Sequence, residues 1–230
     1  MNANDKTPSF FEAFKYMELV EFTSNSDIQN CMIDENIILS NLRNTQHKTV
    51  FDIGAGYGRI TAFLSAKFNQ VESIEIEAEM YKVLKIRSRQ FNNCNSQNLD
   101  YKAYKYSKYS EERMFIFAQN TFGTLNQSME TFTSFLNLIL KKGDELVITF
   151  FTAKSLASIG QSVYKSLEEM VGKINHEKSD FRSGDFVSET NYYSKWVTEK
   201  ELCFFIENIN HKSILQDIEG SFYKIIHFKI

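Results

Sequence analysis

Three glycines that alternate with other residues mark the segment best suited to bind a ligand. The segment V-F-D-I-G-A-G-Y-G-R-I covers residues 50–60, and its glycines are Gly54, Gly56 and Gly58. Glycine permits a tight turn and close approach of the backbone to a ligand, and a helix that starts there presents free N–H groups. An apolar run passes through Asp52 and ends just before this turn. The pattern predicts a binding site where a strand meets a helix.

Glu75 is the second candidate, because it lies in the apolar run V-E-S-I-E-I-E about 20 residues after the turn. Rossmann-like folds place the acid that binds a ribose hydroxyl at this distance. Together the two features predict a cofactor that contains a nucleoside; a turn that merely connects strand and helix is the alternative. The fingerprint G-x-G-x-x-G needs its third glycine where Arg59 stands, which disfavours NAD and FAD and leaves an oxidoreductase as a minor alternative. No G-x-x-x-x-G-K-[ST] motif is present, which excludes a P-loop nucleotide.

The surrounding elements position these residues at one edge of a sheet. From residue 49 onward, strand-like and helix-like runs alternate, which predicts a parallel sheet; the strand-like runs are 49–53, 71–77, 114–118 and 145–151. The last runs, 213–219 and 222–230, are joined so tightly that they must pair antiparallel. Thr198 and Glu201 form the pattern of a capping box and predict a helix before this hairpin.

Composition limits the class of protein. Hydrophobic residues make up 43% and charged residues 24% of the chain, as in ordinary globular proteins. Lys and Arg number 26 against 29 Asp and Glu, so the net charge is −3 and the basic excess of a general phosphate-backbone binder is missing. Nucleic acid is therefore not expected as a partner.

Cys31, Cys94 and Cys203 have no disulfide or metal-ligand spacing, and no metal site is expected. No apolar run reaches the ~20 residues of a membrane helix, and we expect a cytoplasmic protein.

The segment F-D-I-G-A-G-Y-G-R resembles the first motif of the class I S-adenosylmethionine-dependent methyltransferases. The segment I-E-I-E-A-E-M-Y-K-V-L resembles their second strand and the helix that follows. The resemblance covers residues 49–151 and, by topology, the terminal hairpin. It implies a Rossmann-like three-layer α/β sandwich with a seven-stranded, mostly parallel sheet whose last strand is antiparallel, and S-adenosyl-L-methionine as the cofactor.

The resemblance also implies roles for individual residues. The methionine part of the cofactor would be held by Asp52 and by the turn formed by Gly54, Ala55, Gly56, Tyr57 and Gly58. Glu75, with Ile76 beside it, would accept hydrogen bonds from both ribose hydroxyls.

The segment A-Q-N-T-F-G-T-L, residues 118–125, resembles the family's fourth motif as found in several small-molecule methyltransferases. It would place Gln119, Asn120 and Thr121 over the reaction centre. It is not the [DN]-P-P-[YF] of enzymes that methylate exocyclic base amines, so adenine and cytosine amino groups are not expected as acceptors.

The stretch after the third strand departs from the family. The family often has an acid there that contacts the adenine amino group, but no acid lies between Asp100 and Glu111. Adenine would then be recognised by backbone groups, or the third strand ends at a different residue. Tyrosines and lysines alternate in residues 101–109. A base-stacking surface is one interpretation, and a strand with one packed and one solvated face is the favoured one.

The methyl acceptor should contact whatever covers the carboxyl edge of the sheet. We expect a helical cap in residues 1–46 and a cofactor-binding domain in residues 47–230 that carries an insertion, residues 153–196. The candidates for acceptor binding are Tyr16, Arg182, Tyr192, Tyr193 and Trp196. Their aromatic rings suit a cationic amine or the sulfonium, and packing of the insertion onto the sheet is the alternative for the last three.

The sequence thus predicts in-line methyl transfer to a small-molecule amine or hydroxyl. A methyltransferase for protein or RNA and a non-catalytic binding module are the alternatives. None of the four histidines is expected to be catalytic, and no catalytic residue is assigned.

Overall fold

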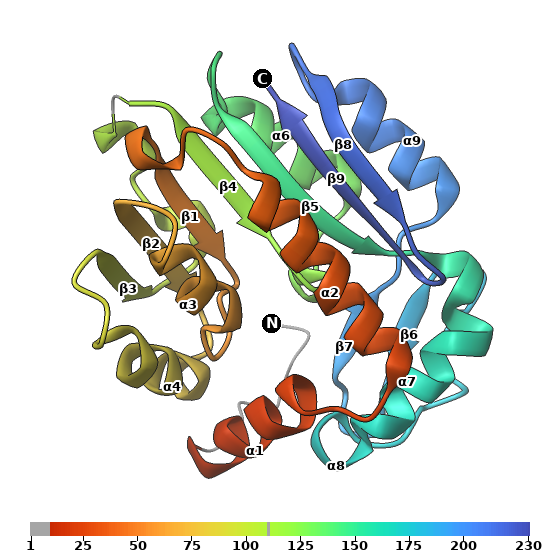
Figure 1. Cartoon of the computed structure of the whole chain (residues 1–230). Coiled ribbons are helices and arrows are strands. Elements are labelled where there is room, and N and C mark those ends of the chain that lie inside the picture. The colour runs from red at the N-terminus through yellow and green to blue at the C-terminus, as the bar shows by residue number, and fades with distance from the viewer. Residues whose placement is uncertain (1–9, 110) are drawn as a thin grey trace.

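A seven-stranded sheet forms the centre of the computed structural model, which describes residues 10–109 and 111–230 (Figure 1). Its strand order is β3-β2-β1-β4-β5-β9-β8, and β9 runs antiparallel to both of its neighbours. The strands are β1 (Thr49–Ile53), β2 (Gln70–Glu75), β3 (Cys94–Asn98), β4 (Arg113–Phe117), β5 (Glu145–Phe151), β8 (Ser213–Glu219) and β9 (Tyr223–Lys229). The expected seven-stranded sheet with an antiparallel last strand is confirmed.

Helices cover both faces of this sheet, which makes a three-layer sandwich (Figure 1). The front layer contains α2 (Ser26–Asn41), α3 (Arg59–Ser65) and α4 (Ala78–Ser88), with α1 (Phe10–Glu21) against α4. The rear layer contains α6 (Met129–Ile139) and α9 (Glu199–Asn208). Because both faces are covered, the central strands are almost continuously apolar, and every residue of β1 and β4 is buried. No helix in residues 10–109 or 111–230 is long and apolar enough to cross a membrane.

Side chains cap the first turns of α2 and α9, and the second of these caps is the one that the sequence predicts. Asn25 accepts hydrogen bonds from the N–H groups of Asp27 and Ile28 at the start of α2. The expected capping box is present at α9, where Thr198 and Glu201 bind each other's backbone N–H groups. These caps satisfy backbone donors that have no partner within the helix.

The first part of the insertion forms several short helical segments, whereas its apolar periodicity predicts one continuous helix. Residues 153–174 carry apolar side chains at helical spacing, but the chain forms a 3₁₀ turn (Ala153–Ser155), a π-helical turn (Leu156–Gly160), α7 (Gln161–Ser166) and α8 (Glu168–Val171). Gly172, with φ of +83°, ends α8. A two-stranded hairpin of β6 (Asp185–Val187) and β7 (Tyr193–Lys195) follows.

The segment after β3 forms two 3₁₀ turns, Tyr101–Ala103 and Tyr106–Lys108, rather than a strand. Its four tyrosines are all buried against the rear face of the sheet, while Lys102, Lys105 and Lys108 are exposed. The expected division into a packed and a solvated side is therefore confirmed, although the backbone conformation differs. The rings of Tyr104, Tyr106 and Tyr109 pack in the interior, so the segment does not present its alternating tyrosines as an extended base-stacking surface.

A buried ion pair ties β4 to the turn before β5. Asp144 accepts hydrogen bonds from the Arg113 backbone N–H at 3.1 Å, from its Nε at 3.2 Å and from its Nη2 at 2.5 Å. Both residues are at most 2% exposed. Removing one member of such a pair leaves the other charged, buried and without its main partner.

We predict that Asp144→Asn lowers the free energy of unfolding by about 3–5 kcal/mol, because the Arg113 guanidinium loses its compensating charge. Urea denaturation measures the change. The matched control is Lys154→Gln, which breaks the exposed pair with Glu219 and should cost less than about 1 kcal/mol. Equal losses in the two variants would contradict the assignment.

Candidate functional site

The glycine turn is fixed by hydrogen bonds to the neighbouring strand. The N–H groups of Gly54 and Ala55 both donate to the carbonyl oxygen of Ile74, at 2.9 and 3.0 Å. Gly54 has a φ of +67°, and a Cβ there would lie 2.5 Å from the Thr121 side chain, so the turn requires glycine at this position. A Cβ at Gly56, by contrast, would meet no heavy atom of the described residues within 4 Å, so this glycine faces open space.

Glu75 ends β2 beside this turn, and its carboxylate is held by two backbone donors. The N–H of Gly56 donates to Oε2 at 2.7 Å, and the N–H of Glu77 donates to Oε1 at 2.8 Å. Burial raises the pKa of Glu75 to about 7. Each carboxylate oxygen can accept a further hydrogen bond, so the pair of oxygens matches the two adjacent hydroxyls of a ribose.

Asp52 lies in β1, two residues before Gly54, and is 2% exposed. Thr61 donates a hydrogen bond from its hydroxyl to Asp52 Oδ2 at 2.5 Å. Burial raises the pKa of this carboxyl to about 6, against the opposing effect of the Thr61 hydrogen bond.

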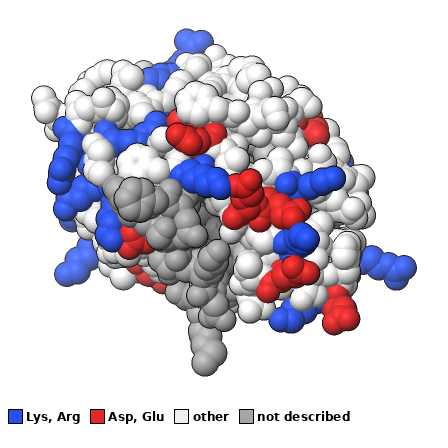
Figure 2. All heavy atoms as spheres, turned by 90° about the horizontal axis from the view of Figure 1, so that it is seen from below, with Lys and Arg blue, Asp and Glu red and all other residues white. Residues whose placement is uncertain are grey.

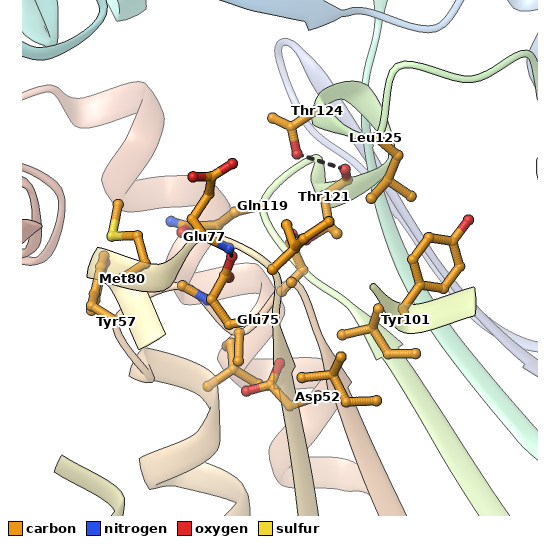
Figure 3. Close-up of a pocket in the computed structure, with 18 of the residues that line it drawn as sticks. Asp52, Tyr57, Glu75, Glu77, Met80, Tyr101, Gln119, Thr121, Thr124 and Leu125 are labelled. Atoms are coloured by element: carbon orange, nitrogen blue, oxygen red, sulfur yellow. Dashed lines mark hydrogen bonds between the residues drawn. The ribbon is translucent and has the colours of Figure 1, made fainter. Parts of the chain in front are cut away.

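A pocket of about 430 Å³ opens between these groups, at the carboxyl ends of β1, β2, β3 and β4. This volume is within the range of small-molecule sites. Figure 3 shows Tyr57 and Met80 on one side of the pocket, Tyr101 and Leu125 on the opposite side, and Asp52 at the base of the view. The pocket thus combines apolar side walls with a few fixed polar groups.

Most of the residues implied for the cofactor come together here. Those that line the pocket are Asp52, Gly54, Ala55, Gly56, Tyr57, Glu75, Ile76, Gln119 and Thr121. Gly58 lies outside the lining and has a φ of +89° at the start of α3. Asn120 also lies outside it; its side chain donates to the Lys195 carbonyl oxygen at 2.9 Å and accepts from the Phe151 N–H at 3.1 Å. Asn120 therefore holds the loop after β4 in place rather than facing the pocket.

The groups that line the pocket fit S-adenosylmethionine. Glu75 can accept from the ribose hydroxyls, the open space at Gly56 lets a ligand approach the backbone, and the side walls can enclose an adenine ring. No nicotinamide or phosphate-binding pattern competes with this interpretation.

The residues implied for acceptor binding are scattered. Tyr192 lines the pocket, whereas Arg182 and Tyr193 do not. Trp196 is fully buried, its Nε1–H donates to the Tyr164 hydroxyl at 2.8 Å, and its ring packs against Phe151. Trp196 thus packs the insertion onto the sheet, the alternative raised for it, and is not accessible to an acceptor. The side chain of Tyr16, in α1, lies outside the described residues.

Asp100 is a pocket residue that the sequence did not identify. It follows the end of β3 by two residues and lines the pocket beside Leu99 and Tyr101. This is the place of the acid that the resemblance relates to the adenine amino group. The strand β3, with the sequence C-N-S-Q-N, is a polar edge strand, so it carries no apolar run by which its end could be located.

Comparison with known proteins gives the family context. A family model described as ribosomal RNA adenine dimethylase matches residues 21–177. The small-subunit ribosomal RNA methyltransferase A of Mesoplasma florum is 38% identical over 60 residues, which is 25% of this chain and 22% of that protein's length.

Solved structures share the fold at low sequence identity. The PH0226 protein of Pyrococcus horikoshii has a TM-score of 0.64 and 11% identity over 92% of this chain and 94% of its own. An S-adenosylmethionine-dependent methyltransferase of Clostridium acetobutylicum has a TM-score of 0.59 and 12% identity over 95% and 97% of the two chains.

We predict that Glu75→Gln weakens binding of S-adenosylhomocysteine about thirtyfold at pH 8, because hydrogen bonds to an ionised carboxylate are lost. With native Glu75, affinity should also fall as the pH drops below about 7, by up to tenfold per pH unit, since the carboxyl is then protonated and must lose its proton to accept both hydroxyls. Titration calorimetry from pH 8 to pH 6 measures both effects.

The Glu75→Gln variant serves as the control for the pH series, because it has no titrating group at this position. Its affinity should change much less between pH 8 and pH 6. An unchanged affinity in the native protein over this interval would refute the assignment of Glu75 to the ribose.

Proposed function

Because the chain belongs to the ribosomal RNA adenine dimethylase family and is an S-adenosylmethionine-dependent methyltransferase, we propose that its methyl acceptor is a base in RNA. The family model covers residues 21–177, which include the glycine turn, Glu75 and the loop after β4. That match is the observation that carries the proposal.

The expectation of a small-molecule acceptor, with nucleic acid disfavoured, is corrected by this finding. Both the family model and the relative in Mesoplasma florum are named for ribosomal RNA methylation. The expectation rested on the net charge of −3, which sums over the whole chain and does not record where the charges lie.

The distribution of charge supports an RNA partner. Six exposed basic residues flank the edge strand β3, and we call this set the basic edge: Lys82 and Lys85 of α4, Arg89 directly after it, and Lys102, Lys105 and Lys108 after β3. Figure 2 shows Lys and Arg gathered on the left of the view, the side on which α4 and β3 lie in Figure 1. On the opposite side, acidic and basic side chains are mixed. A one-sided basic surface attracts a phosphate backbone whatever the net charge of the protein.

The basic edge also leads to the pocket, since Lys102 lines it. An RNA strand bound along this edge would therefore bring a base to the pocket mouth. The target base has to leave its stack to enter, as for other enzymes that act on bases. Tyr101 and Leu125 offer an apolar side wall against which such a base or the adenine of the cofactor can pack.

The chemistry requires positioning more than proton transfer. When bound, the cofactor supplies a methyl group on a positively charged sulfur. Thr121 donates from its hydroxyl to the Ala118 carbonyl oxygen at 2.7 Å, and Thr124 donates to the Thr121 carbonyl oxygen at 2.9 Å (Figure 3). These bonds fix the loop that borders the pocket after β4. A rigid loop can hold an acceptor atom in line and exclude water, which together account for much of the rate.

We predict that the protein transfers radioactive methyl groups from S-adenosylmethionine to ribosomal RNA transcribed without modifications. The label should be released by ribonuclease and resist protease, and mass spectrometry of the nucleosides should identify the methylated base. Glu75→Gln, assayed at a low concentration of S-adenosylmethionine, is the control and should transfer about thirtyfold less label. Label found only in protein or in small molecules would contradict the RNA proposal without affecting the cofactor assignment.

We predict further that Lys82→Glu combined with Lys85→Glu raises the KM for RNA about tenfold or more at low salt, because two attractive charges become repulsive. The affinity for S-adenosylhomocysteine should stay unchanged, since neither side chain lines the pocket. Steady-state kinetics at several salt concentrations measures the effect, which should shrink as salt rises.

The matched control reverses two exposed lysines away from α4 and β3, Lys200 in α9 and Lys229 in β9. This pair changes the net charge equally and should leave the KM for RNA within about twofold. If both double variants raised the KM alike, net charge rather than the basic edge would govern RNA binding.

A further inference from the structure

A buried carboxylate from α2 reaches the wall of the pocket. Glu35 is 2% exposed, and it accepts hydrogen bonds from the Gln119 N–H at 2.7 Å and from the Thr149 hydroxyl at 2.8 Å. Its Oε2 forms an ion pair with the guanidinium of Arg59. One side chain thus connects α2 with the loop after β4, with β5 and with the first residue of α3.

Arg59 is the cation that this carboxylate holds. It follows the glycine turn directly, its side chain is 14% exposed, and it lines the pocket. Its Nε has no hydrogen-bond acceptor among residues 10–109 and 111–230. A buried guanidinium has five N–H donors, and a single carboxylate does not occupy them all.

The pocket contains two other cationic side chains within the part of the chain that the structure describes, and both lie elsewhere. Lys15 of α1 pairs with Glu169, and these two side chains are 55% and 67% exposed. Lys102 is exposed and belongs to the segment that follows β3, next to Asp100. Arg59 is therefore the lining cation that adjoins the glycine turn.

The cofactor has one anionic group, the carboxylate of its amino-acid end. Asp52 and Glu75 are both acids, so an unpaired carboxylate near the glycine turn would be repelled unless a cation is close. The two ends of the pocket differ accordingly: Glu75 suits the sugar, and Arg59 suits the carboxylate. Arginine binds carboxylates through paired N–H groups, which fixes orientation as well as affinity.

We propose that Arg59 binds the carboxylate of S-adenosylmethionine and that Glu35 is a positioning residue, which fixes the Arg59 guanidinium and the Gln119 backbone at the pocket wall. Gln119 has a φ of 46°, which is uncommon for a residue other than glycine. The bond from its N–H to Glu35 stabilises this conformation. The proposal concerns the cofactor and is independent of the identity of the methyl acceptor.

The test compares two ligands in titration calorimetry. S-adenosylhomocysteine carries the amino-acid carboxylate, whereas 5′-methylthioadenosine keeps the adenosine and the sulfur but lacks the amino-acid end. Arg59→Met should weaken S-adenosylhomocysteine about tenfold or more, as expected for a lost bond between two charged groups, and should change 5′-methylthioadenosine by less than about twofold. Arg59→Lys, which keeps the charge but not the paired donors, should give an intermediate loss for S-adenosylhomocysteine.

Glu35→Gln should reproduce the ligand selectivity of Arg59→Met, because Arg59 loses the group that holds it. The matched control is Asp34→Asn, its neighbour in α2, which accepts a hydrogen bond from the Tyr223 hydroxyl at 2.5 Å and does not line the pocket. Asp34→Asn should leave both affinities unchanged, while Glu75→Gln should weaken both ligands equally, since both contain the ribose.

Two results would overturn the proposal. Equal weakening of both ligands by the Arg59 and Glu35 variants would show that these residues only support the fold. Unchanged binding of S-adenosylhomocysteine in folded Arg59→Met, with folding checked by circular dichroism, would show that the carboxylate is bound elsewhere.

Discussion

Parallel pairing of β1 with β2 is the constraint on which the site depends. The register places Ile53 beside Ile74, so the turn after β1 and Glu75 at the end of β2 must meet. The Ile74 carbonyl oxygen then accepts from two turn N–H groups, and the Glu75 carboxylate accepts from a third. The sheet thus prepares both the turn and its acid before any ligand arrives, so little ordering has to occur on binding.

Two buried side chains from outside the sheet also hold the elements around the pocket in place. Glu35 from α2 and Asn120 in the loop after β4 are both almost fully buried, and each bonds to two or more elements. Because a buried polar group is costly unless its hydrogen bonds are satisfied, each fixes its neighbours in one arrangement. Glu35 of α2 and Asn120, which bonds to the insertion, therefore hold the loop after β4 in place, and Gln119 and Thr121 of that loop line the pocket.

The sequence predicts what depends on local pattern and spacing. The glycine turn, Glu75 and the terminal hairpin could be located because each has a signature within a short segment. The Glu35–Arg59 pair could not, since its members lie in different helices and meet only after packing. Asp100 cannot be located from the sequence because a polar edge strand precedes it. For Trp196 the sequence leaves acceptor binding and packing of the insertion both open, because it does not distinguish a buried aromatic ring from an exposed one.

The charge of the protein is another property that the sequence predicts only in part. The sequence gives the net charge, but the positions of the charged side chains on the surface depend on the fold. A net charge of −3 predicts little nonspecific attraction between the whole protein and a polyanion. It does not reveal whether one part of the protein surface is basic. Buried acids such as Glu35, Asp52 and Glu75 contribute to the sum, although they lie inside the protein or face the pocket and not its outer surface. The six cations of the basic edge are all exposed, so a polyanion within a Debye length of about 8 Å would feel their attraction whatever the sum over the chain. On the proposal that RNA carries the methyl acceptor, a protein with a net charge of −3 can attract it through one basic edge, while the acidic side chains of the pocket suit the cationic methyl donor.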